Sequence, residues 1–153
     1  MIDTFTRELE AFFSKTGAAE KMVLATSADN RVTARTMSCI IQERVIYFQT
    51  DRNLLKYQQI SSNPRVALCS GNAQIEGIAQ DIGHPSNKEN TFFTSLFRQH
   101  YERAFTLYSS LPNEAVIKVE PVKITLWAYD NGKPYRDFFD IPEQRYSREY
   151  YGV

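Results

Sequence analysis

Three side chains in the first half of the sequence have the types and spacing that a phosphate site requires. Arg35 lies within a strand-like segment, Thr50 ends the next such segment, and Lys56 follows six residues later, just inside a helix expected to begin at Asn53. A phosphate needs cations, a hydroxyl donor and the free N–H groups of a helix N-terminus. Arg35 can supply a two-pronged guanidinium and Lys56 a point charge. The alternative is that Thr50 is an ordinary strand residue and Lys56 a solvated one.

Cysteine and histidine residues give no sign of a metal centre or a nucleophile. Cys39 and Cys69 form no CxxC pair and no cluster with histidine, so we expect two reduced thiols. His84 and His100 lack the spacing of a metal-binding helix. No GxSxG elbow is present, which disfavours a hydrolase. No residue stands out as a general acid or base, so catalytic residues stay unassigned.

Short strand-like segments joined by tight turns make up most of the chain. We expect strands at 22–27, 32–41, 45–50, 66–69 and 75–82, two more within 115–129 separated by a kink at Pro121, and helices at 4–14, 53–62 and 86–108. This pattern predicts a mainly β fold, a β-barrel with helical insertions. Gly77, in the middle of a strand, predicts a bulge or a close approach of another backbone or a ligand.

Local signals predict where these helices begin. Asn53 is the expected N-cap of the second helix, and Ser86 with Glu89 forms a capping box for the third. Residues 1–16 are expected to form an N-terminal helical segment. Residues 130–153 are expected to be a tail that wraps along this domain or a neighbour.

The last predicted strand has two unlike faces. Ile124 and Leu126 point to one side, which we assign to the core, whereas Trp127 points to the other. A large aromatic side chain on that face needs a cover. We expect a partner subunit or a flat ligand to lie against Trp127.

The composition describes one ordinary domain spanning residues 1–153. The chain has 153 residues, a formal net charge of zero and 42% hydrophobic residues. The lack of a basic excess argues against a nucleic-acid binder. No apolar run approaches the roughly 20 residues of a membrane span, and no secretory signal is visible. We therefore expect a cytoplasmic protein with neither nucleic acid nor membrane as a partner.

Taken in order, several segments resemble the pyridoxamine 5'-phosphate oxidase-like family of FMN-binding split-barrel proteins. The matching segments are Arg35–Met37, Tyr47–Thr50, Lys56, Asn63–Leu68, the Gly77 strand and Leu126–Trp127. Each is unspecific alone, but their order and spacing over roughly residues 20–130 are similar to those of the family, in particular of its general-stress-protein and nitroimidazole-reductase-like members.

The resemblance implies a homodimer with flavin mononucleotide (FMN) at the interface. Arg35 and Lys56 would contact the phosphate or ribityl chain, and Trp127 would reach the flavin from the other subunit. A further contact would fall on Gln74 or Asn72, between which the spacing does not decide. The complete set of cofactor-binding residues that the resemblance implies is Arg35, Thr36, Met37, Gln49, Thr50, Lys56, Gln74 and Trp127.

Departures from the family pattern bear on the substrate. True vitamin-B6 oxidases carry a lysine five positions after the strand arginine, where this chain has Ile40, and often a basic residue where it has Leu55. Arg136 is only a loose counterpart of their C-terminal basic cluster. We therefore expect an FMN-dependent oxidoreductase, a reductase of an unidentified small molecule with NAD(P)H as a possible co-substrate. The alternatives are a non-catalytic flavin-binding or stress-related redox protein and, less favoured, a haem or deazaflavin binder.

Overall fold

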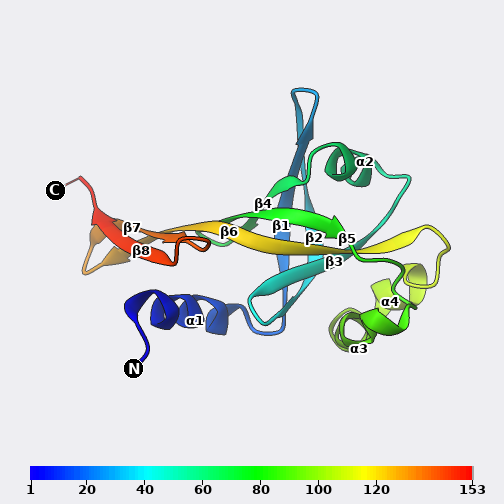
Figure 1. Cartoon of the computed structure of the whole chain (residues 1–153), viewed down its shortest axis with the longest axis horizontal. Helices are drawn as coiled ribbons and strands as arrows, with labels where there is room; N and C mark the ends of the chain where they lie inside the picture. Colours follow the sequence, from blue (N-terminus) through cyan, green and yellow to red (C-terminus); the bar gives the residue numbers. More distant parts are fainter. Residues whose placement is uncertain (153) are drawn as a thin grey trace.

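The computed structural model describes residues 1–152, which form a mainly β protein (Figure 1). The helices are α1 (Thr4–Thr16), α2 (Leu55–Ser62), the 3-10 turn η1 (Lys88–Asn90), α3 (Thr91–His100) and α4 (Glu102–Tyr108). The strands are β1 (Ala19–Ala28), β2 (Arg31–Gln42), β3 (Val45–Asp51), β4 (Arg65–Ser70), β5 (Ala73–Asp81), β6 (Glu114–Asp130), β7 (Lys133–Asp140) and β8 (Arg145–Tyr150).

Strands β1 to β6 close into a barrel because β3 pairs with both β2 and β6. The order around the barrel is β3-β2-β1-β4-β5-β6, and every pairing is antiparallel. Closure pairs the two edges of the sheet that would otherwise stay open. The predicted β-barrel with helical insertions is thus confirmed. Beyond β6 the sheet continues into β7 and β8, so residues 130–153, for which no element was predicted, contribute two strands (Figure 1).

The barrel is filled by the inward-facing residues of each strand. In β5, Ala73, Ile75, Gly77 and Ala79 are buried while the residue after each of them is exposed, the period of two that a half-buried strand requires. The largest fully buried side chains of the barrel include Phe48, Met22, Leu24, Ile46, Leu68, Ile117 and Ile124. A second, smaller cluster joins α3 to the barrel through Phe93 and Phe97.

Strand β6 is one continuous strand, and the prediction of two strands separated at Pro121 was wrong. The pairing with β5 shifts register between Glu76 and Gly77, where Gly77 faces Pro121. A bulge at this point accommodates a residue that has no N–H to donate. A Cβ on Gly77 would lie 2.7 Å from the backbone oxygen of Glu120. The predicted close approach of another backbone at Gly77 is therefore confirmed.

Helix α2 begins later than predicted and has no side-chain cap. The expected cap, Asn53, instead donates its backbone N–H to the Asp51 carboxylate, at 2.7 Å. This turn moves the N-cap to Leu54, whose side chain cannot accept a hydrogen bond. The cap prediction at Asn53 was wrong because the neighbouring aspartate competes for the same turn.

The third predicted helix is divided into α3 and α4. The expected capping box does not form, because the Ser86 hydroxyl hydrogen-bonds with Nδ1 of His84 at 2.8 Å. Tyr101 interrupts the helix, and its hydroxyl donates to the backbone oxygen of Cys39 at 3.0 Å. The non-local contact of Tyr101 with Cys39 ties the junction of the two short helices to β2, at one end of the barrel (Figure 1).

Helix α1 lies beside β7 and β8, at the end of the molecule away from α3 and α4 (Figure 1). Its apolar face buries Phe5, Leu9, Phe12 and Phe13, as the spacing predicted, and Asp3 caps it. Phe12 lies against Phe139 of β7, with ring centroids 6.2 Å apart. Within the described residues, no helix combines the length and apolar character that a bilayer-spanning segment needs.

Candidate functional site

A cavity of about 390 Å³ lies where β2 and β3 meet the start of α2 and the end of α4. Its lining includes Thr36 and Met37 from β2, Gln49 and Thr50 from β3, and Lys56 from α2. The structure therefore brings most of the predicted site residues together. The volume is within the usual range of small-molecule sites.

Lys56 is the basic residue among those that line this cavity. Its Nζ donates to the Thr50 hydroxyl at 3.3 Å. Burial lowers the pKa of Lys56, and the nearby Arg35 guanidinium lowers it further, while the carboxylates of Glu114 and Asp51 act in the opposite direction. Two cations thus lie close enough to repel each other.

Arg35, one residue before Thr36 on β2, does not itself line the cavity, and neutral oxygens hold its guanidinium. Its guanidinium donates to the Leu24 backbone oxygen at 3.2 Å, to the Thr26 hydroxyl at 2.9 Å and to the Thr33 hydroxyl. Burial lowers the pKa of Arg35. Among the ion pairs within residues 1–152, none includes Arg35 or Lys56. Half-buried cations without a counter-ion favour the binding of an anion.

Sequence reasoning missed Glu114, the first residue of β6. It pairs across the sheet with Asp51, and both residues line the cavity. The Glu114 residue is only 4% exposed. Burial raises the pKa of Glu114 to about 7; Asp51 raises it too, against the opposite effects of Lys56 and His84. No sequence signal could have found Glu114, because its place beside Asp51 depends on the pairing of β3 with β6.

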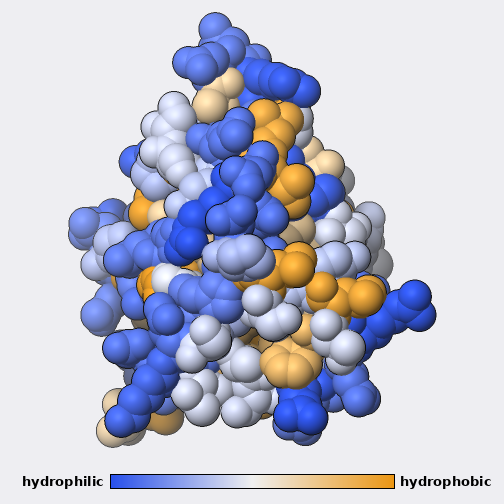
Figure 2. Space-filling model, turned by 90° about the vertical axis from the view of Figure 1, so that its right-hand side faces the viewer, coloured by the Kyte–Doolittle hydropathy of each residue, from blue (hydrophilic) through white to orange (hydrophobic). Residues whose placement is uncertain are grey.

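The helical insertion supplies the apolar wall of the cavity. Phe97 of α3 and Ala104 and Tyr108 of α4 line it. The hydroxyl of Ser109 donates to Gln49 Oε1 at 2.8 Å, and this buried hydrogen bond ties the end of α4 to β3. Figure 2, seen from the side where α3 and α4 lie in Figure 1, shows apolar side chains gathered among polar ones. This apolar wall suits the flat apolar part of a ligand, and Lys56 suits an anionic part.

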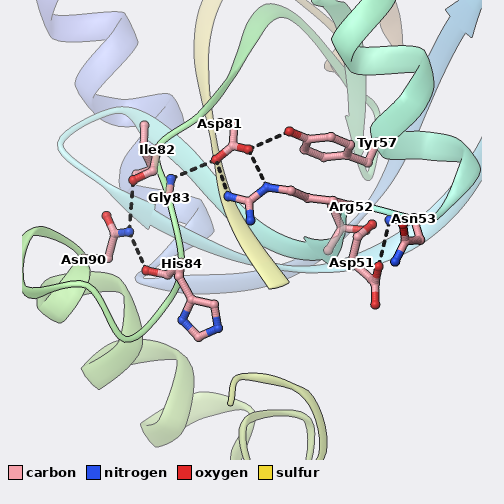
Figure 3. A network of polar contacts seen from close by, with 10 residues as sticks. Asp51, Arg52, Asn53, Tyr57, Asp81, Ile82, Gly83, His84 and Asn90 are labelled. Carbon is pink, nitrogen blue, oxygen red and sulfur yellow. Dashed lines mark hydrogen bonds and ion pairs between the residues drawn. The ribbon is translucent and has the colours of Figure 1, made fainter. Parts of the chain in front are cut away.

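A polar network around Arg52 and Asp81 anchors the turn between β3 and α2 (Figure 3). The Arg52 guanidinium donates to the Asp81 carboxylate from Nε at 3.0 Å and from Nη2 at 3.3 Å. The same carboxylate accepts from the Tyr57 hydroxyl and from the backbone N–H of Gly83. The network thereby joins the β3–α2 turn, α2 and the end of β5.

Gln74 and Trp127 are not part of this cavity. They line a second hollow of about 430 Å³ on the outer side of β4, β5 and β6, together with Asn72 and Cys69. Trp127 is 40% exposed there, so it faces away from the core as predicted. Within one protomer, five of the predicted site residues thus line the first cavity, Gln74 and Trp127 line the second hollow, and Arg35 lines neither.

Comparison with known proteins identifies the family. The sequence profile described as pyridoxamine 5'-phosphate oxidase matches residues 5–128. The chain belongs to the pyridoxamine 5'-phosphate oxidase family. This confirms the resemblance drawn from the sequence. Comparison with curated proteins gives no match.

Solved structures share the split-barrel fold of this family. General Stress Protein 26 from Bacillus anthracis is 21% identical, with a TM-score of 0.61 over 77% of this chain and 92% of its own. A pyridoxamine 5'-phosphate oxidase-related, FMN binding protein from Nostoc punctiforme is 15% identical, with a TM-score of 0.59 over 99% and 98%. HutZ, the heme storage protein from Vibrio cholerae, is 10% identical, with a TM-score of 0.65 over 84% and 98%.

The structure places the two residues at which the sequence departs from the vitamin-B6 oxidase pattern, Ile40 and Leu55. Ile40 is fully buried beside Phe93 and Phe97. Leu55 is exposed at the start of α2 and does not line the cavity. Neither position presents a cation to a second phosphate.

Proposed function

We propose that this protein binds FMN and acts as an FMN-dependent oxidoreductase, a reductase of a small molecule other than a vitamin-B6 phosphate. The observation behind the proposal is the half-buried Lys56, which forms no ion pair and donates to the Thr50 hydroxyl in the cavity, with the Arg35 guanidinium near enough to lower its pKa. The N-terminus of α2 has no side-chain cap, and the N–H groups of a helix N-terminus can bind a phosphate. Family membership supports the same cofactor.

The donor set fits the cofactor. Lys56, Thr50 and Arg35 would hold the phosphate, and Gln49 and the β2 backbone at Thr36 and Met37 would lie along the rest of the molecule. Bound FMN supplies hydride or single-electron transfer through its ring. The chain itself supplies position, charge and the apolar wall that excludes water.

We propose further that the working unit is a homodimer. Gln74 and Trp127 lie outside the protomer's own cavity, on an exposed face that includes the apolar side chains of Val23 and Ile78. A second copy against this face would cover Trp127 and bring it to the partner's flavin. Each FMN site would then contain Lys56 from one subunit and Trp127 from the other.

The phosphate assignment is tested with Lys56→Met and Arg35→Met. Hydrogen bonds to charged groups contribute about 1.5–3 kcal/mol, so each variant should bind FMN roughly 10- to 100-fold more weakly. The measurements are the flavin absorbance of the purified protein and the quenching of FMN fluorescence on titration. Lys133→Met, at the exposed first residue of β7, is the matched control and should bind like the parent. If both cavity variants retain the parent's affinity, the assignment is wrong.

A mixing experiment tests the shared site. Lys56→Met and Trp127→Ala homodimers should each bind FMN weakly. Subunit exchange between them creates heterodimers in which one of the two sites is intact, so about a quarter of all sites should recover. No recovery in a mixture that has exchanged subunits would contradict a site built from two subunits.

The alternatives make different predictions for the purified protein. A flavin carrier would hold FMN but would not be reduced by NADH or NADPH, whereas a reductase would lose its flavin absorbance anaerobically. A haem protein needs an axial ligand. His84 is engaged through both ring nitrogens, with Ser86 and with the Leu111 backbone oxygen, and neither it nor His100 lines the cavity. A visible spectrum with flavin bands and no Soret band would exclude haem.

A further inference from the structure

Glu114 is a buried acid whose negative charge, when ionised, would oppose the binding of a phosphate in the proposed site. Its carboxyl lines the same cavity as Lys56 and Thr50. It takes part in none of the side-chain hydrogen bonds or ion pairs found within residues 1–152. The residue is 96% removed from solvent, since only 4% is exposed. An unpartnered carboxyl that faces a cavity is available to a ligand.

The groups around Glu114 come from four different elements. Asp51 on β3 lies directly opposite, Lys56 comes from α2, His84 from the segment after β5, and Tyr108 from α4. Burial and the Asp51 carboxylate together raise the pKa of Glu114 to about 7, although Lys56 and His84 oppose this effect. The acid can therefore gain or lose a proton near neutral pH with little cost.

A phosphate dianion changes this balance. When it binds at Lys56, an ionised Glu114 would lie near two further negative charges, and like charges at short range are costly in a buried site. A neutral carboxyl avoids that repulsion and gains an O–H donor that a phosphate oxygen can accept. Proton binding and phosphate binding at this cavity should then favour each other.

We propose that Glu114 is a ligand of the cofactor phosphate in its protonated form, so that FMN binding takes up a proton from solution. The proton moves from water to a carboxylate oxygen of Glu114, and no other bond is made or broken. This proposal rests on the proposed function, because it needs a phosphate at Lys56. It makes the affinity for FMN depend on pH, through a residue of this chain.

Titrations across the pH range test the proposal. FMN fluorescence quenching should give a Kd for the wild type that rises more than about tenfold between pH 7 and pH 8.5, where the free phosphate is already a dianion. Glu114→Gln, which keeps the shape and a hydrogen-bond donor, should change less than about twofold and should bind FMN more tightly than the wild type at pH 8.5. Glu120→Gln, an exposed acid on the same strand, should keep the wild-type slope.

Two further measurements do not depend on the variant. Calorimetry of the wild type at pH 7.5 in buffers of different ionisation enthalpy should show uptake of about 0.8 proton per FMN. Riboflavin, which lacks the phosphate, should show no such pH dependence. A wild-type Kd that is constant from pH 7 to pH 8.5, zero proton uptake, or an unchanged slope in Glu114→Gln would overturn the role of Glu114 and leave FMN binding intact. Failure of the wild type to bind FMN at any pH would overturn both proposals.

Discussion

Replacing Asp81 with asparagine tests the polar network that anchors the turn between β3 and α2 (Figure 3). The Asp81 carboxylate accepts hydrogen bonds from Arg52 Nε at 3.0 Å, from the Tyr57 hydroxyl at 2.7 Å and from the Gly83 N–H at 2.8 Å. Burial raises the pKa of Asp81, but the hydrogen bonds from Arg52, Tyr57 and Gly83 outweigh it and hold the pKa below its usual value. The group is therefore ionised at neutral pH. Asparagine keeps the shape and removes the charge.

The expected loss follows from the contacts. Hydrogen bonds between charged groups contribute about 1.5–3 kcal/mol, and screening reduces this where side chains reach solvent. The Asp81 and Arg52 side chains are 28% and 37% exposed. We expect Asp81→Asn to lower the free energy of unfolding by about 2 kcal/mol, and Tyr57→Phe by about 1 kcal/mol. The double variant should lose less than the sum, because both changes remove bonds to one acceptor.

Urea unfolding at pH 7 and at pH 3 measures these losses. Because the pKa of Asp81 is lower in the folded state, its contribution is complete above the unfolded pKa of about 3.9 and disappears as the pH falls through the folded value. The difference in free energy of unfolding between the wild type and Asp81→Asn should therefore be smaller at pH 3 than at pH 7. Asp29→Asn, in an exposed turn, is the control and should change stability by less than about 0.5 kcal/mol. An equal loss at both pH values, or a loss no larger than the control's, would refute the reasoning.

Three more predictions concern stability. Glu114→Gln should raise the free energy of unfolding by about 1–3 kcal/mol at pH 8 and leave it unchanged at pH 4, measured by urea titration, because the folded state retains a proton that the unfolded chain loses as the pH rises from 4.5 to about 7. Gly77→Ala should cost about 1–3 kcal/mol in chemical denaturation, since its Cβ would lie 2.7 Å from a backbone oxygen. Phe93→Ala should cost about 3–5 kcal/mol in thermal melts, against less than 0.5 kcal/mol for the exposed Leu107→Ala.

Helix boundaries show where prediction from the sequence stops. Asn53 and Ser86 are good capping residues, yet neither caps a helix. The Asp51 carboxylate accepts a hydrogen bond from the Asn53 N–H, and the Ser86 hydroxyl hydrogen-bonds with Nδ1 of His84. Several local partners of similar strength compete at such a turn, and the surrounding packing decides between them. The strands were easier to predict, because alternation of buried and exposed residues depends on the barrel as a whole and not on a single bond.

The sequence by itself determined the barrel and the pairing of Thr50 with Lys56. Strand periodicity predicts the barrel, and the spacing of Thr50 and Lys56 predicts that they lie together, because the strand–turn–helix between them is local. Only the tertiary structure decided that Glu114 faces Asp51, since that contact requires β3 to pair with a strand far along the chain. The separation of Trp127 from the cavity has the same cause. Contacts between distant segments depend on how the sheet closes, and no local pattern of residues specifies that.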